Sequence, residues 1–198
     1  MGANLNSLII CDIESTCWNT PEEQGAKPNE VIEIGICVLN LKPTAAKTTI
    51  TDKRSYPVKP KFTEISEFCT SLTGWTQAEI DKAPPIEDVL KQIATDYGVT
   101  KNHIWCSYGE YDRVKLSSSP DQQGGLFDLY RIERDSNPFA LFRAHYNVKT
   151  LMALKERLPR ELGMVRALSY YGIELEGRHH NGADDAFNIA KILSSVLS

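Results

Sequence analysis

The sequence predicts an α/β fold in which helices flank a mixed β-sheet. Two runs near the start, residues 8–13 and 31–40, are rich in apolar and β-branched residues and have the length of buried strands. Later segments change to helical spacing, most clearly over residues 86–98 and 183–197. Because strand-like runs return between the helical segments, we expect strands and helices to pack as layers around one core.

The first part of the chain is expected to hold three strands. The runs at 8–13 and 31–40 are separated by the polar stretch TPEEQGAKPNE at 20–30, which is typical of a loop. A third strand is predicted at 54–59, RSYPVK. Its Pro57 indicates an edge strand, because proline has no N–H to donate to a neighbour.

Helical periodicity follows the third strand. The segment EISEFCTSL at 64–72 has helical spacing, and Thr76 is a candidate cap for the short helix TQAEIDKA. A Pro-Pro pair then interrupts the chain. The next segment, residues 86–98, repeats apolar residues at helical spacing and ends at Gly98, as a helix of ordinary length does.

The second half of the chain supplies two more strands and the last helices. HIWCSY at 103–108 and LFRAHYNV at 141–148 are the predicted fourth and fifth strands. The segment SSSPDQQGG at 117–125 is typical of a turn or flexible loop, and the residues from there to Phe139 show no clear period. Further helices are expected at 150–158, 161–172 and 183–197.

Length and composition indicate one globular domain, residues 1–198. Hydrophobic residues make up 41% and charged residues 24% of the chain, which is neither a disordered nor a membrane composition. No apolar run approaches the roughly 20 residues that a membrane-spanning helix needs. The five cysteines lack the spacing of a zinc site and are typical of buried thiols in a reducing compartment, so we expect a cytoplasmic location.

The formal net charge of −4 argues against a simple basic module that binds nucleic acid. It does not exclude an enzyme that acts on nucleic acid, because two divalent cations held by acidic side chains would offset this charge.

Two acids in the first strand form the first candidate site. Side chains at i and i+2 point to the same side of a strand, so Asp12 and Glu14 project together with Cα atoms about 6–7 Å apart. At that separation two negative charges repel by about 2–3 kcal/mol at an effective dielectric constant of about 20. Two interpretations are open: the acids lie at a solvated strand end, or a cation lies between them.

A second group of polar residues opens the last helix. Asn181 or Asp184 is a candidate cap, so one of the two adjacent acids, Asp184 and Asp185, is expected to be structural. His180 and Asp185 are too far apart for one helical face, but they can converge if Gly182 lets the loop fold back. A lone histidine is more often a hydrogen-bonded structural residue than a catalyst.

A third acid, Asp112, directly follows the fourth predicted strand within YGEYD at 108–112. On its own it is explained as a cap of the helix that begins RVKL.

Together with longer motifs, these residues resemble the DnaQ-like 3′–5′ exonucleases of DEDDh type. The resemblance is greatest to the branch of the histone-mRNA and siRNA-degrading exonucleases and the KapD-like proteins. It extends roughly from Ser7 to Leu197 and is weakest over 113–141. The motifs that carry it are CDIESTCW (11–18), EFCTSLTGWTQAEID (67–81), YGEYD (108–112), HYNVKTLMAL (145–154) and GRHHNGADDAFNIAKIL (177–193).

The resemblance implies a ribonuclease H-like fold, with a mixed five-stranded sheet flanked by helices, and two Mg²⁺ or Mn²⁺ ions in the active site. The family's four acidic positions fall on Asp12, Glu14, Asp112 and Asp185, and its histidine falls on His180. Asp12 is then expected to bridge both ions and His180 to take the proton of the attacking water. His179 is the rival for this role; His180 is preferred because its H-x4-D spacing leads to Asp185.

The resemblance also implies a pocket for the terminal nucleotide of a single-stranded 3′ end. Glu14, Thr16 and His180 are expected to line it, together with Leu72, Thr73 and Trp75 of the LTGW stretch. Trp75 is interpreted either as a residue that stacks on a base or as a core residue.

The predicted function is metal-dependent 3′–5′ hydrolysis of RNA or short oligonucleotides, with RNA favoured by the resemblance alone. A DNA exonuclease and a regulatory protein-binding module on an exonuclease fold are the alternatives. Membrane binding is not expected, and target choice can depend on a partner protein.

Overall fold

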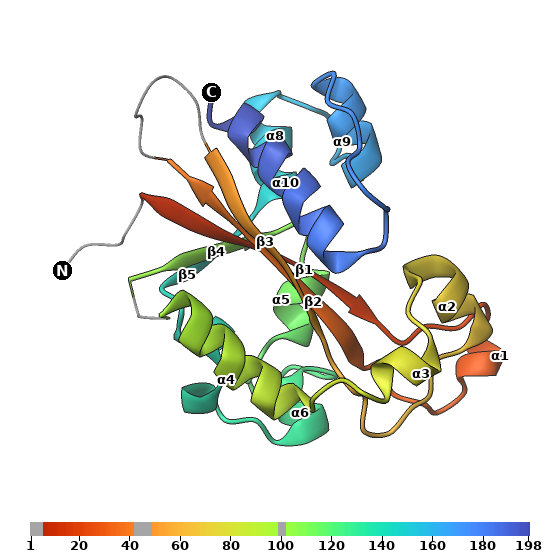
Figure 1. The fold of residues 1–198 in the computed structure, drawn as a ribbon. Coiled ribbons are helices and arrows are strands. Elements are labelled where there is room, and N and C mark those ends of the chain that lie inside the picture. Colours follow the sequence, from red (N-terminus) through yellow and green to blue (C-terminus); the bar gives the residue numbers. More distant parts are fainter. Residues whose placement is uncertain (1–5, 42–48, 99–101) are drawn as a thin grey trace.

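A computed structural model describes residues 6–41, 49–98 and 102–198. Its centre is a mixed five-stranded sheet in the order β3-β2-β1-β4-β5 (Figure 1). The strands β1, β2 and β3 are antiparallel neighbours, whereas β4 pairs parallel to β1 and β5 pairs parallel to β4. Their bounds are Ser7–Ser15 (β1), Val31–Asn40 (β2), Thr49–Pro57 (β3), Ile104–Ser107 (β4) and Ala144–Asn147 (β5). The prediction of a mixed five-stranded sheet flanked by helices is confirmed.

Ten α-helices are described around this sheet in residues 6–41, 49–98 and 102–198. They are α1 (Pro21–Gln24), α2 (Glu67–Thr73), α3 (Gln77–Ile80), α4 (Ile86–Tyr97), α5 (Tyr111–Lys115), α6 (Leu126–Tyr130), α7 (Pro138–Leu141), α8 (Val148–Lys155), α9 (Met164–Tyr170) and α10 (Gly182–Val196), and a 3₁₀ turn spans Arg134–Ser136. No helix in the described part of the chain is both long enough and apolar enough to cross a bilayer.

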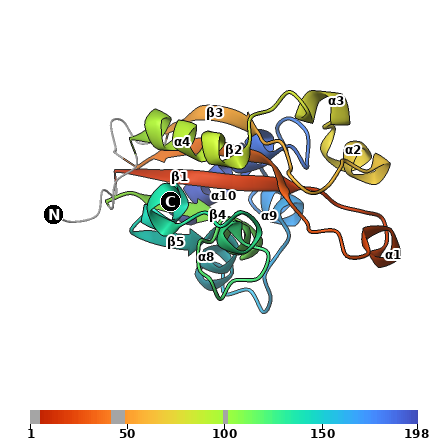
Figure 2. The ribbon, with the colours of Figure 1, turned by 90° about the horizontal axis from the view of Figure 1, so that it is seen from below.

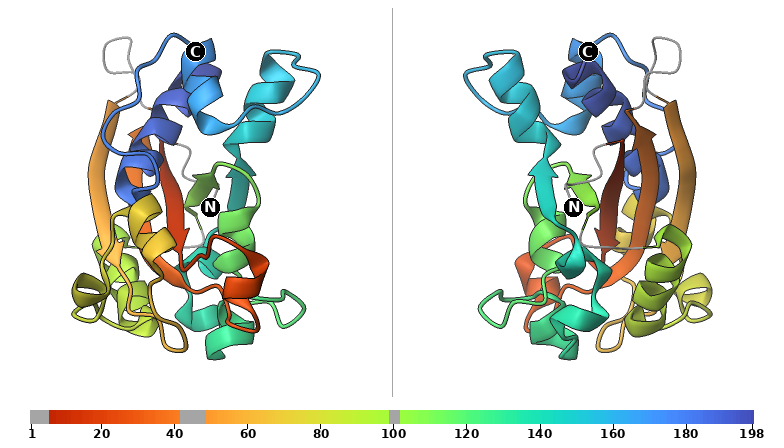
Figure 3. Two further views of the ribbon diagram at one scale, coloured as in Figure 1. Left: turned by 90° about the vertical axis from the view of Figure 1, so that its right-hand side faces the viewer. Right: turned by 90° about the vertical axis from the view of Figure 1, so that its left-hand side faces the viewer.

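The sheet is covered on both faces, so its central strands are almost wholly apolar. Alternate residues of β1 enter two separate cores: Ile9 and Ile13 pack toward α4, whereas Leu8 and Ile10 pack toward α8, α9 and α10. Figures 1 and 3 show α4 and α10 on opposite faces of the sheet. Asp12 and Glu14 continue the series of Leu8 and Ile10, and this alternation therefore directs them to the α10 face.

Three short helices, α1, α2 and α3, gather beyond the end of β1 (Figure 2). Each begins at a side-chain cap: the Thr20, Ser66 and Thr76 hydroxyls accept backbone N–H groups of the first turn. Thr76 was the predicted cap of α3, and this prediction is confirmed. Helix α1 lies inside the stretch 20–30 that was predicted to be a loop, because Thr20 caps it and Pro21 suits its first position.

Several predicted elements have different bounds in the structure, and the third strand and the helix that follows it are examples. The third strand begins at Thr49 rather than at residue 54 and ends at Pro57. Most of its side chains are exposed, so the strand has little of the alternation that marks a half-buried strand. Its place at the edge of the sheet is confirmed. The helix predicted at 64–72 begins only at Glu67, because Ser66 caps it there.

A close contact between two glycines seats the start of α10 on the sheet. A Cβ on Gly35 of β2 would lie 1.9 Å from the carbonyl carbon of Gly182, and a Cβ on Gly182 would lie 3.2 Å from the Asp12 carbonyl oxygen. Only hydrogen fits at Gly35, because the neighbouring atoms are backbone and cannot rotate away. The first turn of α10 is thereby placed directly beside Asp12.

Gly35→Ala is expected to push α10 away from β2 and to destabilise the fold by about 1–3 kcal/mol, the usual effect of overpacking. Denaturant unfolding measures the change. Gly163→Ala is the matched control, since a Cβ at Gly163 meets nothing within 4 Å. Equal stability of the two variants would contradict the close contact.

Candidate active site

Three carboxylates converge where the end of β1 meets the start of α10. Asp12, Glu14 and Asp185 each offer an oxygen such that these atoms lie within 4.8 Å of one another. Glu14 is 8% and Asp185 3% exposed, so water screens their charges poorly. The reading of Asp12 and Glu14 as a solvated strand end therefore does not describe this site.

Asp112 lies next to this cluster, in the first turn of α5. Its Oδ1 accepts the N–H of Ile13 at 3.0 Å, between the two acids of β1. The cap of α5 is Glu110, so the interpretation of Asp112 as a helix cap is wrong. Strand β1 pairs with β4 only at Ile9 and Ile10, which leaves the later N–H of Ile13 for the carboxylate.

The pKa values of all four acids are raised, and burial is the largest cause at each. The pKa of Asp12 is well above its usual value because burial is joined by the charges of Asp112 and Glu14. Burial and the charge of Asp185 raise the pKa of Glu14 to about 8. Burial raises the pKa of Asp112 to about 6 and that of Asp185 above its usual value. The folded chain therefore favours an added positive charge here, as a proton or as a cation.

The stability of the metal-free protein is expected to fall as the pH rises. Glu14 and Asp112 bind protons more tightly in the folded than in the unfolded chain, so their contribution is present at low pH and lost as the pH passes through about 6 to about 8. Urea unfolding in the presence of a chelator, from about pH 5 to about pH 9, measures this loss. Glu14→Gln should flatten the upper part of the curve, and a stability that rises over this range would contradict the pKa shifts.

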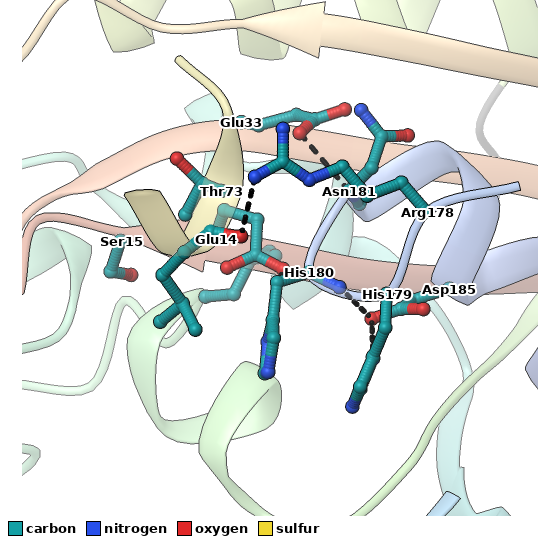
Figure 4. A network of polar contacts seen from close by, with 12 residues as sticks. Glu14, Ser15, Glu33, Thr73, Arg178, His179, His180, Asn181 and Asp185 are labelled. Carbon is teal, nitrogen blue, oxygen red and sulfur yellow. Dashed lines mark hydrogen bonds and ion pairs between the residues drawn. The ribbon is translucent and has the colours of Figure 1, made fainter. Parts of the chain in front are cut away.

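The two histidines lie beside the cluster with their rings stacked at 3.9 Å (Figure 4). His179 Nδ1 contacts Asp185 Oδ2 at 2.9 Å, and the backbone N–H of His180 donates to the same oxygen at 2.9 Å. The His180 ring lies over the other acid, with its Nδ1 4.0 Å from Glu14 Oε1. Its backbone has a φ of +65°, so His180 itself is the left-handed residue that turns the chain back toward Asp185. Gly182, to which the sequence assigned this turn, is instead the first residue of α10.

Asp184 and Asp185 have the divided roles that the sequence suggested. Asp184 accepts the backbone N–H of Arg178 at 2.7 Å and pairs with Lys53, so it holds the loop before α10. Asn181 caps α10 by accepting the N–H of Asp184. Asp185 alone of the two acids joins the carboxylate cluster.

The residues predicted to line a nucleotide pocket lie close to this loop. Thr16 is fully buried, and its hydroxyl accepts the N–H of Glu30. Thr73 is also buried and accepts the N–H of Trp75. The carbonyl of Leu72 accepts a hydrogen bond from the side chain of Arg178. This bond joins α2 to the loop before α10 that holds Arg178, His179 and His180, here called the histidine loop. The hydroxyls of Thr16 and Thr73 are thus engaged with backbone groups of the chain itself.

Two residues organise the site in roles that the sequence did not predict. Arg178 donates to the carbonyls of Ser71 and Leu72. Glu33 of β2 is fully buried and accepts hydrogen bonds from Trp75 and from the first turn of α10. The signal for Glu33 was a charged residue inside the otherwise apolar run VIEIGICVLN; for Arg178 no local signal exists.

The cluster fits a hard cation. Asp185 Oδ1 is buried and has no hydrogen-bond partner in the described structure, so a lone pair is left for a ligand. Carboxylate oxygens are the donors that hard divalent cations prefer. The arrangement therefore supports a divalent-metal centre.

The chain is similar to several exonucleases along almost its whole length. It is 28% identical to the 3′-5′ exonuclease eri1 of Schizosaccharomyces pombe, over 98% of this chain and 69% of that protein. It is 31% identical to ERI1 exoribonuclease 2 of Danio rerio and 29% identical to 3′-5′ exoribonuclease 1 of Homo sapiens, over 96% of this chain in each case. The chain spans 35% and 52% of the length of these two relatives.

Solved structures agree with the fold. A full-length 3′-exonuclease superposes with a TM-score of 0.81 at 27% identity, over 100% of this chain and 62% of that chain. The nuclease domain of 3′hExo, a DEDDh family member bound to rAMP, superposes with a TM-score of 0.76 at 25% identity, over 100% of this chain and 94% of that one. The resemblance to the DEDDh exonucleases is thereby confirmed.

The sequence model of the exonuclease family RNase_T matches residues 9–193, a span that holds every acid of the cluster. Because the match covers nearly the whole chain, this chain belongs to the RNase_T exonuclease family.

Proposed function

We propose that this protein is a divalent-metal-dependent 3′–5′ exonuclease that removes nucleotides from the 3′ end of RNA. The observation that carries the proposal is the convergence of Asp12, Glu14 and Asp185 within 4.8 Å, on elements distant in the sequence. RNA is favoured over DNA because relatives of this chain are named exoribonucleases.

Asp12, Glu14 and Asp185 would hold the metal, and Asp112 beside them would complete the ligand set. Mg²⁺ and Mn²⁺ suit these donors, and the four acids would suffice to hold two such ions. When bound, the ions supply a hydroxide near neutral pH and offset the negative charge on the leaving 3′-oxygen. The protein's part is to hold the four acids close together and largely out of water, where their raised pKa values mean that an added cation is favoured.

His180 is proposed as the general base. Burial and the neighbouring His179 lower the pKa of His180, which keeps its imidazole neutral and able to accept a proton near neutral pH. Its side chain is 40% exposed, so substrate and water can reach it. The ring of His179 is instead engaged with Asp185 and is better placed to orient that carboxylate.

The terminal nucleotide is proposed to lie between the backbone of Glu14–Thr16, the LTGW stretch and the His180 ring. Arg178 links the LTGW side to the histidine loop, since it donates to the carbonyls of Ser71 and Leu72 at 2.8 and 3.2 Å. This pocket would admit one unpaired 3′ nucleotide at a time.

A degradation assay on a 5′-labelled oligoribonucleotide, with Mn²⁺, with Mg²⁺ and with a chelator, tests the proposal. A ladder of products shortened from the 3′ end, dependent on the metal, is the expected result. Faster loss of a matched DNA strand would instead make the protein a DNA exonuclease. Intact substrate with every metal tried would contradict the enzymatic function and favour a protein-binding role.

A further inference from the structure

Glu33 is a buried carboxylate beside the proposed metal ligands that the proposed chemistry does not use. It lies in β2 directly opposite Glu14 and is fully buried. Opposed residues of antiparallel strands point to the same face, where two like charges destabilise the pair. A buried carboxylate that repels its neighbours persists only where other contacts offset the repulsion.

The contacts of Glu33 are all with hydrogen-bond donors. Oε2 accepts the indole N–H of Trp75 at 2.8 Å and the backbone N–H of Gly182 at 3.0 Å. Oε1 accepts the hydroxyl of Ser55 at 2.6 Å and the N–H of Ala183 at 3.4 Å. Four converging donors match an ionised carboxylate, which only accepts.

Two of these donors are the first N–H groups of α10, which have no partner within their own helix. Glu33 binds those of Gly182 and Ala183, and the Asn181 side chain binds that of Asp184. Glu33 thus both ties the first turn of α10 to β2 and places a negative charge at the positive end of the helix dipole. That turn is continuous with Asp185 and follows directly on His180.

The indole of Trp75 is the other group that Glu33 fixes. Trp75 is half-buried against Ile32, Cys69 and Ile80, and its N–H points to Glu33. A single carboxylate oxygen, Oε2, therefore joins the LTGW side of the proposed nucleotide pocket to the helix that carries a proposed metal ligand.

We propose that Glu33 is a positioning residue that fixes α10 and Trp75 relative to each other, and so aligns Asp185 with the nucleotide pocket. The inference rests on the proposed function. Partners that orient metal ligands from behind typically change metal affinity or activity by about 10- to 100-fold when removed.

Three variants separate anchoring from charge. Glu33→Ala removes both, and is expected to weaken Mn²⁺ binding by about 10- to 100-fold. Glu33→Gln removes the charge but keeps an oxygen for Trp75 and Gly182, while Ser55 can accept from the new amide. Mn²⁺ affinity in Glu33→Gln is therefore expected to return most of the way to that of the wild type. Ser55→Ala, which leaves α10 and Trp75 anchored, is the control with near wild-type binding.

Calorimetric titration with Mn²⁺, and with AMP in the presence of Mn²⁺, supplies readouts that do not depend on catalysis. Equal loss of Mn²⁺ affinity in Glu33→Gln and Glu33→Ala would mean that charge alone acts, and would overturn the positioning role. Wild-type affinity in Glu33→Ala would overturn it as well.

Trp75→Phe tests the second contact and does not require the alanine variant to fold. It keeps the ring and Glu33 but removes the N–H, so AMP binding is expected to weaken while Mn²⁺ affinity is kept. Unchanged AMP binding would remove Trp75 from the proposal. If the wild-type protein binds Mn²⁺ and AMP but degrades no RNA, the proposed function fails. The binding titrations of the Glu33 variants then still decide whether Glu33 is a positioning residue.

Discussion

Asp12→Asn is expected to abolish exonuclease activity and at the same time to stabilise the metal-free protein. Asp12 faces Asp112, Glu14 and Asp185, and these charges together with burial raise its pKa well above the usual value. Asparagine removes the repulsion but cannot replace an anionic metal ligand. Loss of several kcal/mol of transition-state stabilisation lowers the rate by at least about 10³-fold, since about 1.4 kcal/mol corresponds to a factor of ten.

Two measurements check this prediction. The first is the initial rate of RNA shortening with Mn²⁺. The second is the melting temperature in a chelator, where a gain of about 1 kcal/mol raises Tm by about 2–4 °C for a domain of this size. Added Mn²⁺ should raise Tm in the wild type and much less in the variant. Asp88→Asn, which changes an exposed acid on α4, is the control for both measurements. Wild-type activity in Asp12→Asn would contradict the assignment of Asp12 to the metal centre.

His180→Asn is expected to lower kcat by about 10²- to 10⁴-fold, the usual contribution of a general base. Asparagine is chosen because it tolerates the left-handed backbone that His180 adopts, at a φ of +65°. Binding of Mn²⁺ should change little, because the His180 ring lies 4.0 Å from Glu14 and holds no ligand in place through its side chain.

His179→Asn is the matched comparison. The His179 ring contacts Asp185 at 2.9 Å, so this variant is expected to weaken Mn²⁺ binding while high metal concentration restores most of kcat. A larger and unrestorable loss of kcat in His179→Asn than in His180→Asn would reverse the roles proposed for the two rings.

Elements with a strong local pattern were predictable from sequence. Strand β2 has the predicted bounds, and α10 differs by one residue at each end. The alternation of β1 placed Asp12 and Glu14 on one face because the strand is covered by a core on each side. These are cases in which periodicity, burial and local preference agree.

Short elements held by distant contacts were not predictable. The segment 113–141 contains the end of α5 and all of α6 and α7. Each of these helices has only four or five residues, too few to display a helical period. Asn137 illustrates what holds it, since its buried side chain donates to the carbonyl of Leu116. The fifth strand is likewise shorter than predicted, at four residues, because α7 extends to Leu141, a bend follows, and α8 begins at Val148.

The active site also has a part that was predictable from sequence and a part that was not. The spacing of each acid in the chain was visible, but its surroundings were not. From its local sequence Asp112 was interpreted as a helix cap, whereas in the fold its carboxylate accepts the N–H of Ile13. Glu33 likewise depends on partners from β3, α10 and the LTGW stretch. Contacts between residues far apart in sequence leave no local pattern.

The order of the ligands along the chain bears on when the protein can become active. Asp12 comes early in the sequence and Asp185 late, and the two meet only after α10 has docked on β1 and β2. Protein synthesis proceeds from the N-terminus, so a nascent chain lacks the second of these carboxylates until α10 has been made. A copy that ends before α10 therefore has an incomplete carboxylate cluster and, under the proposed function, no means of hydrolysing the messenger from which it is being translated.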